Sequence, residues 1–222
     1  MSGHATSRSA LRAGLFWGAV WGLYEATVGY LIHSFVRMPG TASVLMVPFA
    51  VFCLLSATQS GGARRSAAVA ALTAAAIKLV DLALPLPNLL AVLNPAAAIL
   101  MEGLAFTLVA RQLGLPGRRP TLPQAAVGAL LFSTGWRVLF LGWSAVLAAG
   151  WSVGMMKHGL HAPLGFLVRD SLLSAAVIVG LVSLTHGRGR TPLLTRSAPG
   201  AAAVAAVLLL AVAAEVAVGL FG

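Results

Sequence analysis

Long apolar stretches separated by short polar loops dominate this sequence. An apolar α-helix needs about 20 residues to cross the hydrocarbon core of a bilayer, so 222 residues accommodate six or seven crossings. A content of 59% hydrophobic and only 9% charged residues excludes an ordinary soluble domain. The sequence therefore predicts an all-α fold, a polytopic membrane helix bundle of six or seven transmembrane helices in one domain, 1–222.

Turn-forming residues set the limits of the predicted spans. Pro39 and Gly40 follow the first span, and the Gly-rich turn QSGGARRS follows the second. Asn94 and Pro95 suit a helix start, with Asn as the cap and Pro at the first helical position. We expect seven spans, at 11–33, 43–58, 67–84, 95–111, 125–148, 164–185 and 200–221.

The loop cations indicate an orientation. With seven spans, ten loop arginines fall on one side, and only Arg37 and Lys157 fall on the other. Cytoplasmic loops carry the excess of positive charge, so we expect a cytoplasmic N-terminus and a bacterial-type inner (plasma) membrane. This topology accounts for the net charge of +10, and the lipid bilayer rather than nucleic acid is the expected partner.

Small residues recur every fourth position along the first predicted span. This spacing places them on one stripe of a helix, where another backbone can approach closely. Aromatic residues lie largely on another face, where packing against neighbouring helices is favoured over stacking on a flat ligand. The stripe comprises Ala10, Gly14, Gly18, Gly22 and Ala26, and the aromatic residues are Trp17, Trp21 and Tyr24.

Every carboxylate of the chain lies inside a predicted span, and no loop contains one. At about 1.5 Å per residue, most of these groups map to the outer half of the bundle. An unpaired charge there would be costly, whereas paired charges form an interior network. The carboxylates are Glu25, Asp81, Glu102, Asp170 and Glu215, and Lys78, Arg137 and Arg169 lie in the same spans.

The spacing of these charges predicts their partners. Lys78 and Asp81 are spaced i,i+3 on one helix and can pair directly. Arg169 and Asp170 are adjacent and point about 100° apart, so each is expected to find a partner on another helix. Cross-helix pairs of Glu25 or Glu102 with Arg137 or Arg169 are expected. The candidate substrate-binding residues are Glu25, Lys78, Asp81, Glu102, Arg137, Arg169 and Asp170.

Three functions are compatible with a charged membrane interior. Binding or transport of a small polar solute through an outward-facing charged cavity is favoured, because intramembrane ionisable residues usually mark a pathway. The first alternative is an enzyme acting on a lipid-linked substrate, with Glu25, Glu102 or Asp170 as acid or base. The second is a scaffold subunit whose charges only fix helix register. The chain contains no H-E-x-x-H motif, which favours a non-catalytic role, and no cofactor is expected.

A weaker signal concerns metal binding at the outer face. His33, His158 and His161 map there together with Met155 and Met156. Imidazole and thioether ligands suit a transition metal such as copper or nickel, although an interfacial histidine is more often simply solvated.

In architecture, residues 10–185 resemble the membrane-embedded substrate-binding subunits of energy-coupling-factor vitamin transporters. The number of spans, the small-residue stripe and the polar groups towards the outer leaflet carry this resemblance. It implies that Gly14, Gly18, Gly22 and Ala26 would contact another membrane subunit, the transmembrane coupling subunit, through the first helix. The seventh span and the Gly-rich stripe depart from the family pattern, and no substrate is implied.

Overall fold

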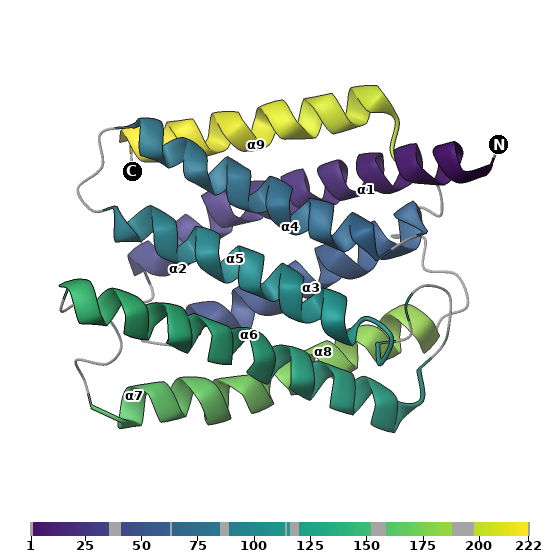
Figure 1. Cartoon of the computed structure of the whole chain (residues 1–222). Helices are drawn as coiled ribbons and strands as arrows, with labels where there is room; N and C mark the ends of the chain where they lie inside the picture. Colours follow the sequence, from purple (N-terminus) through teal and green to yellow (C-terminus); the bar gives the residue numbers. More distant parts are fainter. Residues whose placement is uncertain are drawn as a thin grey trace.

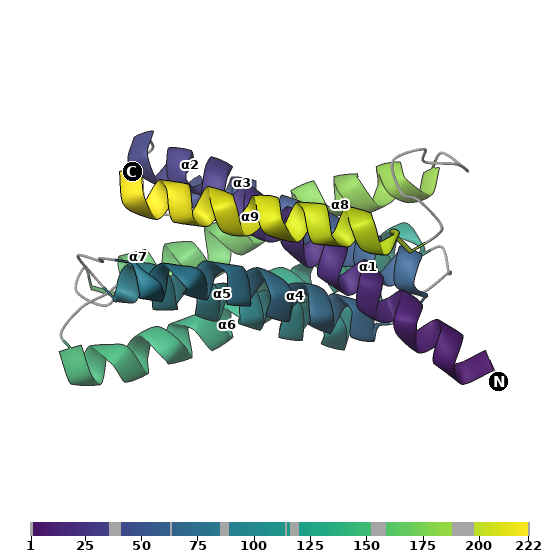
Figure 2. The ribbon, with the colours of Figure 1, turned by 90° about the horizontal axis from the view of Figure 1, so that it is seen from above.

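The structure, a computed structural model, describes the backbone of residues 2–35, 41–62, 64–84, 89–113, 115, 120–151, 159–187 and 198–221. Within these ranges the chain is helical and contains no strand. The helices run side by side as an elongated bundle, with the N- and C-termini at opposite ends (Figures 1 and 2). The prediction of an all-α fold is confirmed for the described chain.

The described helices form seven consecutive runs along the chain, and two of these runs contain π-helical segments. The first run comprises α1 (Ser2–Tyr24), the π-helix η1 (Glu25–Gly29) and α2 (Tyr30–Phe35). The second is α3 (Thr41–Gly61), and the third is α4 (Arg65–Lys78) with the 3₁₀-helix η2 (Leu79–Ala83). The others are α5 (Leu90–Val109), α6 (Leu122–Trp151), then α7 (His161–Leu164) with the π-helix η4 (Gly165–Arg169) and α8 (Asp170–Gly187), and finally α9 (Ala201–Phe221).

Five helices in the described ranges are long and apolar enough to cross a membrane. The first run is not among them, because its glycines, its aromatic residues and Glu25 lower its hydropathy. For α3 the side chains are described from Leu45 to Gly61, and this apolar part alone is shorter than a span. The chain thus has the helices of a multi-pass membrane protein, while the first two predicted spans stay predictions. The five are Arg65–Ala83, Leu90–Val109, Leu122–Leu147, His161–Leu184 and Ala201–Leu220.

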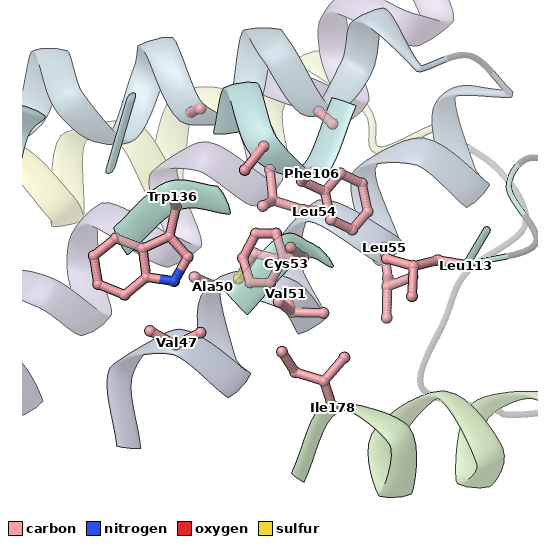
Figure 3. Close-up of a cluster of buried hydrophobic side chains, with 14 of the residues drawn as sticks. Val47, Ala50, Val51, Cys53, Leu54, Leu55, Phe106, Leu113, Trp136 and Ile178 are labelled. Carbon is pink, nitrogen blue, oxygen red and sulfur yellow. The ribbon is translucent and has the colours of Figure 1, made fainter. Parts of the chain in front are cut away.

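Helix α3 lies at the centre of the hydrophobic core. It packs against α1, α4, α5 and α8, and its Val51, Cys53 and Leu54 are completely buried. Figure 3 shows the side chains of α3 beside Phe106 of α5 and Trp136 of α6. Most of the described apolar residues of α3 are therefore buried among the other helices, as expected for a helix that is hydrophobic all round.

Helix α1 approaches α4 closely through its glycines. A Cβ atom at Gly18 would lie 2.4 Å from the carbonyl oxygen of Ala70, and one at Gly14 would lie 2.5 Å from the Cβ of Val69. A Cβ at Gly22 would lie 2.8 Å from the Cδ1 of Ile77. The glycine stripe thus lies against α4 of the same chain, and Ala26 is also buried.

Helix α5 packs closely against another face of α4, again through a glycine. A Cβ at Gly103 would lie 2.2 Å from the Cβ of Ala71. Helix α4 is rich in alanine, and several of its alanines, including Ala70 and Ala74, are completely buried. Small side chains on α4 therefore let two neighbouring helices approach it closely, as in membrane helix packing.

The structure corrects the predicted start of the fourth span. Helix α5 begins at Leu90, so Pro95 lies inside the helix rather than at its first position. A proline inside a helix removes one backbone hydrogen bond. Leu90 and Val92 are buried in the bundle, and their burial offsets part of this cost. Asn94 is not the cap, and its side-chain oxygen accepts a hydrogen bond of 3.0 Å from the indole nitrogen of Trp143 on α6.

We predict that Gly18→Leu destabilises the fold by about 1–3 kcal/mol or more, because a branched side chain cannot fit where two backbones nearly touch. The measurement is thermal unfolding of the purified protein in detergent. Gly180→Leu is the matched control, because a Cβ at this exposed position of α8 would meet no described atom within 4 Å. Equal melting temperatures for both variants and the wild type would contradict the observed packing.

Candidate functional site

The guanidinium of Arg137 is completely buried in the bundle. Its Nη1 donates a hydrogen bond of 2.9 Å to the carbonyl oxygen of Ser133, one turn earlier on α6. Its Nη2 donates one of 2.8 Å to the hydroxyl oxygen of Ser174 on α8. A buried polar group needs such partners, so α6 and α8 hold this cation jointly.

Serine and aromatic side chains complete the surroundings of Arg137. Ser171 of α8 donates a hydrogen bond of 3.2 Å to the same carbonyl oxygen of Ser133. The guanidinium carbon lies 4.6 Å from the ring centroid of Trp136 and 5.2 Å from that of Phe166. A cation at this distance from an aromatic face is attracted by the ring. Arg137 is therefore held both by hydrogen bonds and by contacts with aromatic rings.

Two buried carboxylates act on Arg137. Glu102 of α5 is 6% exposed, Asp170 at the start of α8 is 2% exposed, and both interact electrostatically with the guanidinium. Glu102 also interacts with Glu25. The structure thus brings Glu25, Glu102, Arg137 and Asp170 into one electrostatically connected group, which we call the Arg137 cluster.

Arg169 lies at the edge of this group. Its Nε donates a hydrogen bond of 2.8 Å to Asp170 Oδ1, while its side chain is 64% exposed. The expectation that Arg169 and Asp170 would each pair with another helix is therefore wrong for Arg169, because its long side chain folds back onto the neighbouring carboxylate. Asp170 is also the first residue after the π-helix η4.

Glu25 begins the π-helical segment of the first run. Its Oε1 accepts a hydrogen bond of 3.3 Å from the indole nitrogen of Trp21, and a Cβ at Gly29 would lie 3.2 Å from its Oε2. Lys78 of α4 also interacts electrostatically with Glu25. Glu25 is thus linked to two charged groups on different helices, Glu102 on α5 and Lys78 on α4. Single π-helical turns are frequent at functional sites.

A second group of charges lies where α4, η2 and α9 meet. Lys78 Nζ donates a hydrogen bond of 2.8 Å to Asp81 Oδ2 and a second, shorter one to Glu215 Oε1. The predicted pairing of Lys78 with Asp81 is confirmed. Glu215 was not among the candidate site residues. It is the single charge of the apolar segment 200–221, and this isolation was the signal that could have identified it. Lys78, Asp81 and Glu215 form the Lys78 cluster.

Several buried polar atoms near these charges have no hydrogen-bond partner within the described part of the chain. Around Arg137 they are Ser133 Oγ, Trp136 Nε1 and Asp170 Oδ2, and in the Lys78 cluster they are Asp81 Oδ1 and Glu215 Oε2. Buried polar groups are nearly always satisfied. These orphaned atoms therefore leave hydrogen-bonding capacity unused in both clusters.

The aromatic residues of the first run pack against α3. The ring of Tyr24 stacks on Phe49 at 3.8 Å between centroids with 14° between the planes. Trp17 meets Phe52 edge-on at 5.5 Å and donates a hydrogen bond of 3.2 Å to Ser60 Oγ. These contacts account for the rings by packing against a neighbouring helix.

The proposed histidine ligands cannot be assembled from the described residues. His161 is exposed at the start of α7, whereas His158 and the side chain of His33 lie outside the residues that the structure describes. In the described part of the chain, no group of three His, Cys, Asp or Glu side chains could hold a metal ion. The metal site stays a prediction.

Comparisons with known protein families, with curated proteins and with solved structures found nothing that matches this chain. The expected likeness to the substrate-binding subunits of vitamin transporters therefore stays a prediction.

Proposed function

We propose that this chain binds a small polar solute at the Arg137 cluster and carries it across a membrane. In this proposal the chain spans a bacterial-type inner membrane seven times, its N-terminus is cytoplasmic, and the cluster lines a cavity that opens to the outer side. Five apolar helices of sufficient length support the membrane location. The excess of loop arginines on one side supports the orientation.

The observation that carries this proposal is the buried guanidinium of Arg137 with orphaned polar atoms on its neighbours. The atoms belong to Ser133, Trp136 and Asp170, which all interact with Arg137. Two of these atoms are hydrogen-bond donors, and the third is a carboxylate oxygen that accepts. A purely structural ion network gains by satisfying every polar atom, so unsatisfied groups of both kinds favour a ligand.

The charges suggest what kind of solute would fit. A guanidinium binds carboxylate or phosphate oxygens, while Glu102 and Asp170 attract cationic or hydrogen-bond-donating groups. Both kinds of group are present within one electrostatic cluster. The best match is a small solute that carries an anionic group together with a donor, such as a zwitterion.

A structural role for the charges is the competing function. The direct pairs of Lys78 with Asp81 and with Glu215 favour it, because paired charges can hold helices in register. If this role applied to the whole interior, the Arg137 cluster would bind no solute, and substitutions there would change stability alone.

Ligand binding should be visible as thermal stabilisation of the purified protein. We expect a member of a panel of zwitterionic amino acids, small carboxylates and inorganic phosphate to raise the wild-type melting temperature, since a ligand at 100 times its Kd adds about 2.7 kcal/mol. Arg137→Gln should abolish this shift. Arg65→Gln, which removes an exposed arginine at the start of α4, should keep it. A shift that survives in Arg137→Gln would exclude this site.

Charge coupling within the cluster can be measured with a double-mutant cycle. Arg137→Gln and Asp170→Asn should each destabilise the protein, and the double variant should recover part of the loss. The coupling energy of residues in one network is about 0.5–3 kcal/mol. Arg65→Gln with Asp170→Asn provides the additive control. Additivity of the Arg137 and Asp170 substitutions would show that the two residues face separate environments.

The proposed topology can be tested with fused reporters. A reporter placed after Gly222 should report the outside, and one inserted in the loop 112–123 should report the cytoplasm, because seven spans put these positions on opposite sides. If both reporters indicate the cytoplasm, the span 200–221 does not cross the membrane.

A further inference from the structure

We propose that the Lys78 cluster is a proton-binding site, in which Asp81 and Glu215 hold one proton between them at neutral pH. This site is separate from the Arg137 cluster, and it does not depend on whether Arg137 binds a solute.

One ammonium group holds both carboxylates of the cluster. Lys78 Nζ contacts Asp81 Oδ2 and Glu215 Oε1, so the two carboxylates lie beside each other, and they are close enough to repel when both are ionised. The side chain of Glu215 is 1% exposed and that of Asp81 is 10% exposed. The two carboxylates are therefore almost completely removed from solvent.

Each carboxylate has a second oxygen that Lys78 does not contact. Asp81 Oδ1 and Glu215 Oε2 are buried, and neither has a hydrogen-bond partner among the described residues. An ionised carboxylate only accepts hydrogen bonds, whereas a protonated one also donates. A proton on one of the two groups supplies the donor that these orphaned acceptors lack.

The charge balance favours the same conclusion. Two carboxylates and one ammonium carry a net charge of −1, and an uncompensated charge among apolar helices is costly. Two neighbouring carboxylates in such a site share a proton, because both cannot readily ionise together. One bound proton makes the cluster neutral.

Two further acidic residues lie on elements that pack against the cluster: Glu102 on α5, which contacts η2, and Glu25 on η1, which contacts α9. Glu25 also interacts electrostatically with Lys78. When Glu25 is ionised, its negative charge makes proton binding at Asp81 or Glu215 more favourable. The other described charges of α1 and α4 are Arg8, Arg12 and Arg65, which lie at the opposite ends of their helices.

A metal ion fits this cluster less well than a proton does. The ammonium of Lys78 already occupies the position between the carboxylates. Hard cations such as Ca²⁺ and Mg²⁺ take about six or more oxygen ligands, and the two orphaned oxygens are too few. Gly219 leaves the remaining space small, since a Cβ there would lie 3.5 Å from Asp81 Oδ1 and 2.4 Å from a methyl carbon of Leu84.

Infrared difference spectroscopy of the purified full-length protein tests this proposal. The wild type should show the carbonyl stretching band of a buried carboxylic acid at neutral pH, and the band should disappear when alkali is added. Asp81→Asn and Glu215→Gln should each abolish the same band completely, because the remaining carboxylate then pairs with Lys78 as an ion. Two variants are used so that the test still gives an answer if one of them does not fold.

The control and the contrary outcomes are specific to this cluster. Arg65→Gln should keep the band, because Arg65 is exposed at the opposite end of α4 and its removal leaves the Lys78 cluster unchanged. The proposal is overturned if neither Asp81→Asn nor Glu215→Gln removes a band, or if each removes a different one. The proposal is also overturned if adding sodium ions at constant pH removes the band, since the site would then bind the metal cation rather than a proton.

Discussion

The close approach of α1 and α5 to the alanine-rich helix α4 determines how the interior is arranged. Gly18 of α1 and Gly103 of α5 both lie where a side chain would collide with α4. This double contact brings Glu25 and Glu102 into electrostatic range of each other, although they come from helices that lie on either side of α4. Without small residues on all three helices, the carboxylates would be held apart by side-chain packing. The charged interior is therefore a consequence of glycine and alanine positions.

The two clusters compensate their charges in different ways. In the Lys78 cluster every charged group contacts an opposite charge directly, so the cost of burial is offset by short-range pairing. Around Arg137, serine oxygens and aromatic rings stabilise the guanidinium alongside carboxylates on neighbouring helices. Removing one partner of a buried pair costs about 3–5 kcal/mol. Because Glu25 interacts with both Lys78 and Glu102, a change of charge in one cluster alters the field in the other.

Much of the fold follows from local sequence patterns, while the partners of the charges do not. Hydropathy predicts the long helices, and the i,i+3 spacing predicts the pairing of Lys78 with Asp81. The contact of Glu215 with Lys78 joins residues 137 positions apart. It depends on the position of α9 relative to α4 along the helix axes, and no local sequence pattern predicts this position. The hydrogen bond from Arg169 to Asp170 depends on the side-chain rotamers of these residues at the end of a π-helix. Whether these groups bind a solute depends on the space between helices, which sequence spacing does not determine.

The π-helical segments also determine where this chain tolerates a change of length. In a π-helix the backbone hydrogen bonds reach one residue further than in an α-helix, so the segment starting at Glu25 accommodates one residue more per turn than its neighbours. Losing one residue within Glu25–Gly29 would give an ordinary turn and leave the helices on both sides in their present rotation. Losing one residue between Gly14 and Gly22 would instead turn the glycine face by about 100° away from α4. Evolution can thus shorten the first run at its charged turn without unpacking the bundle, at the cost of the position that Glu25 now occupies.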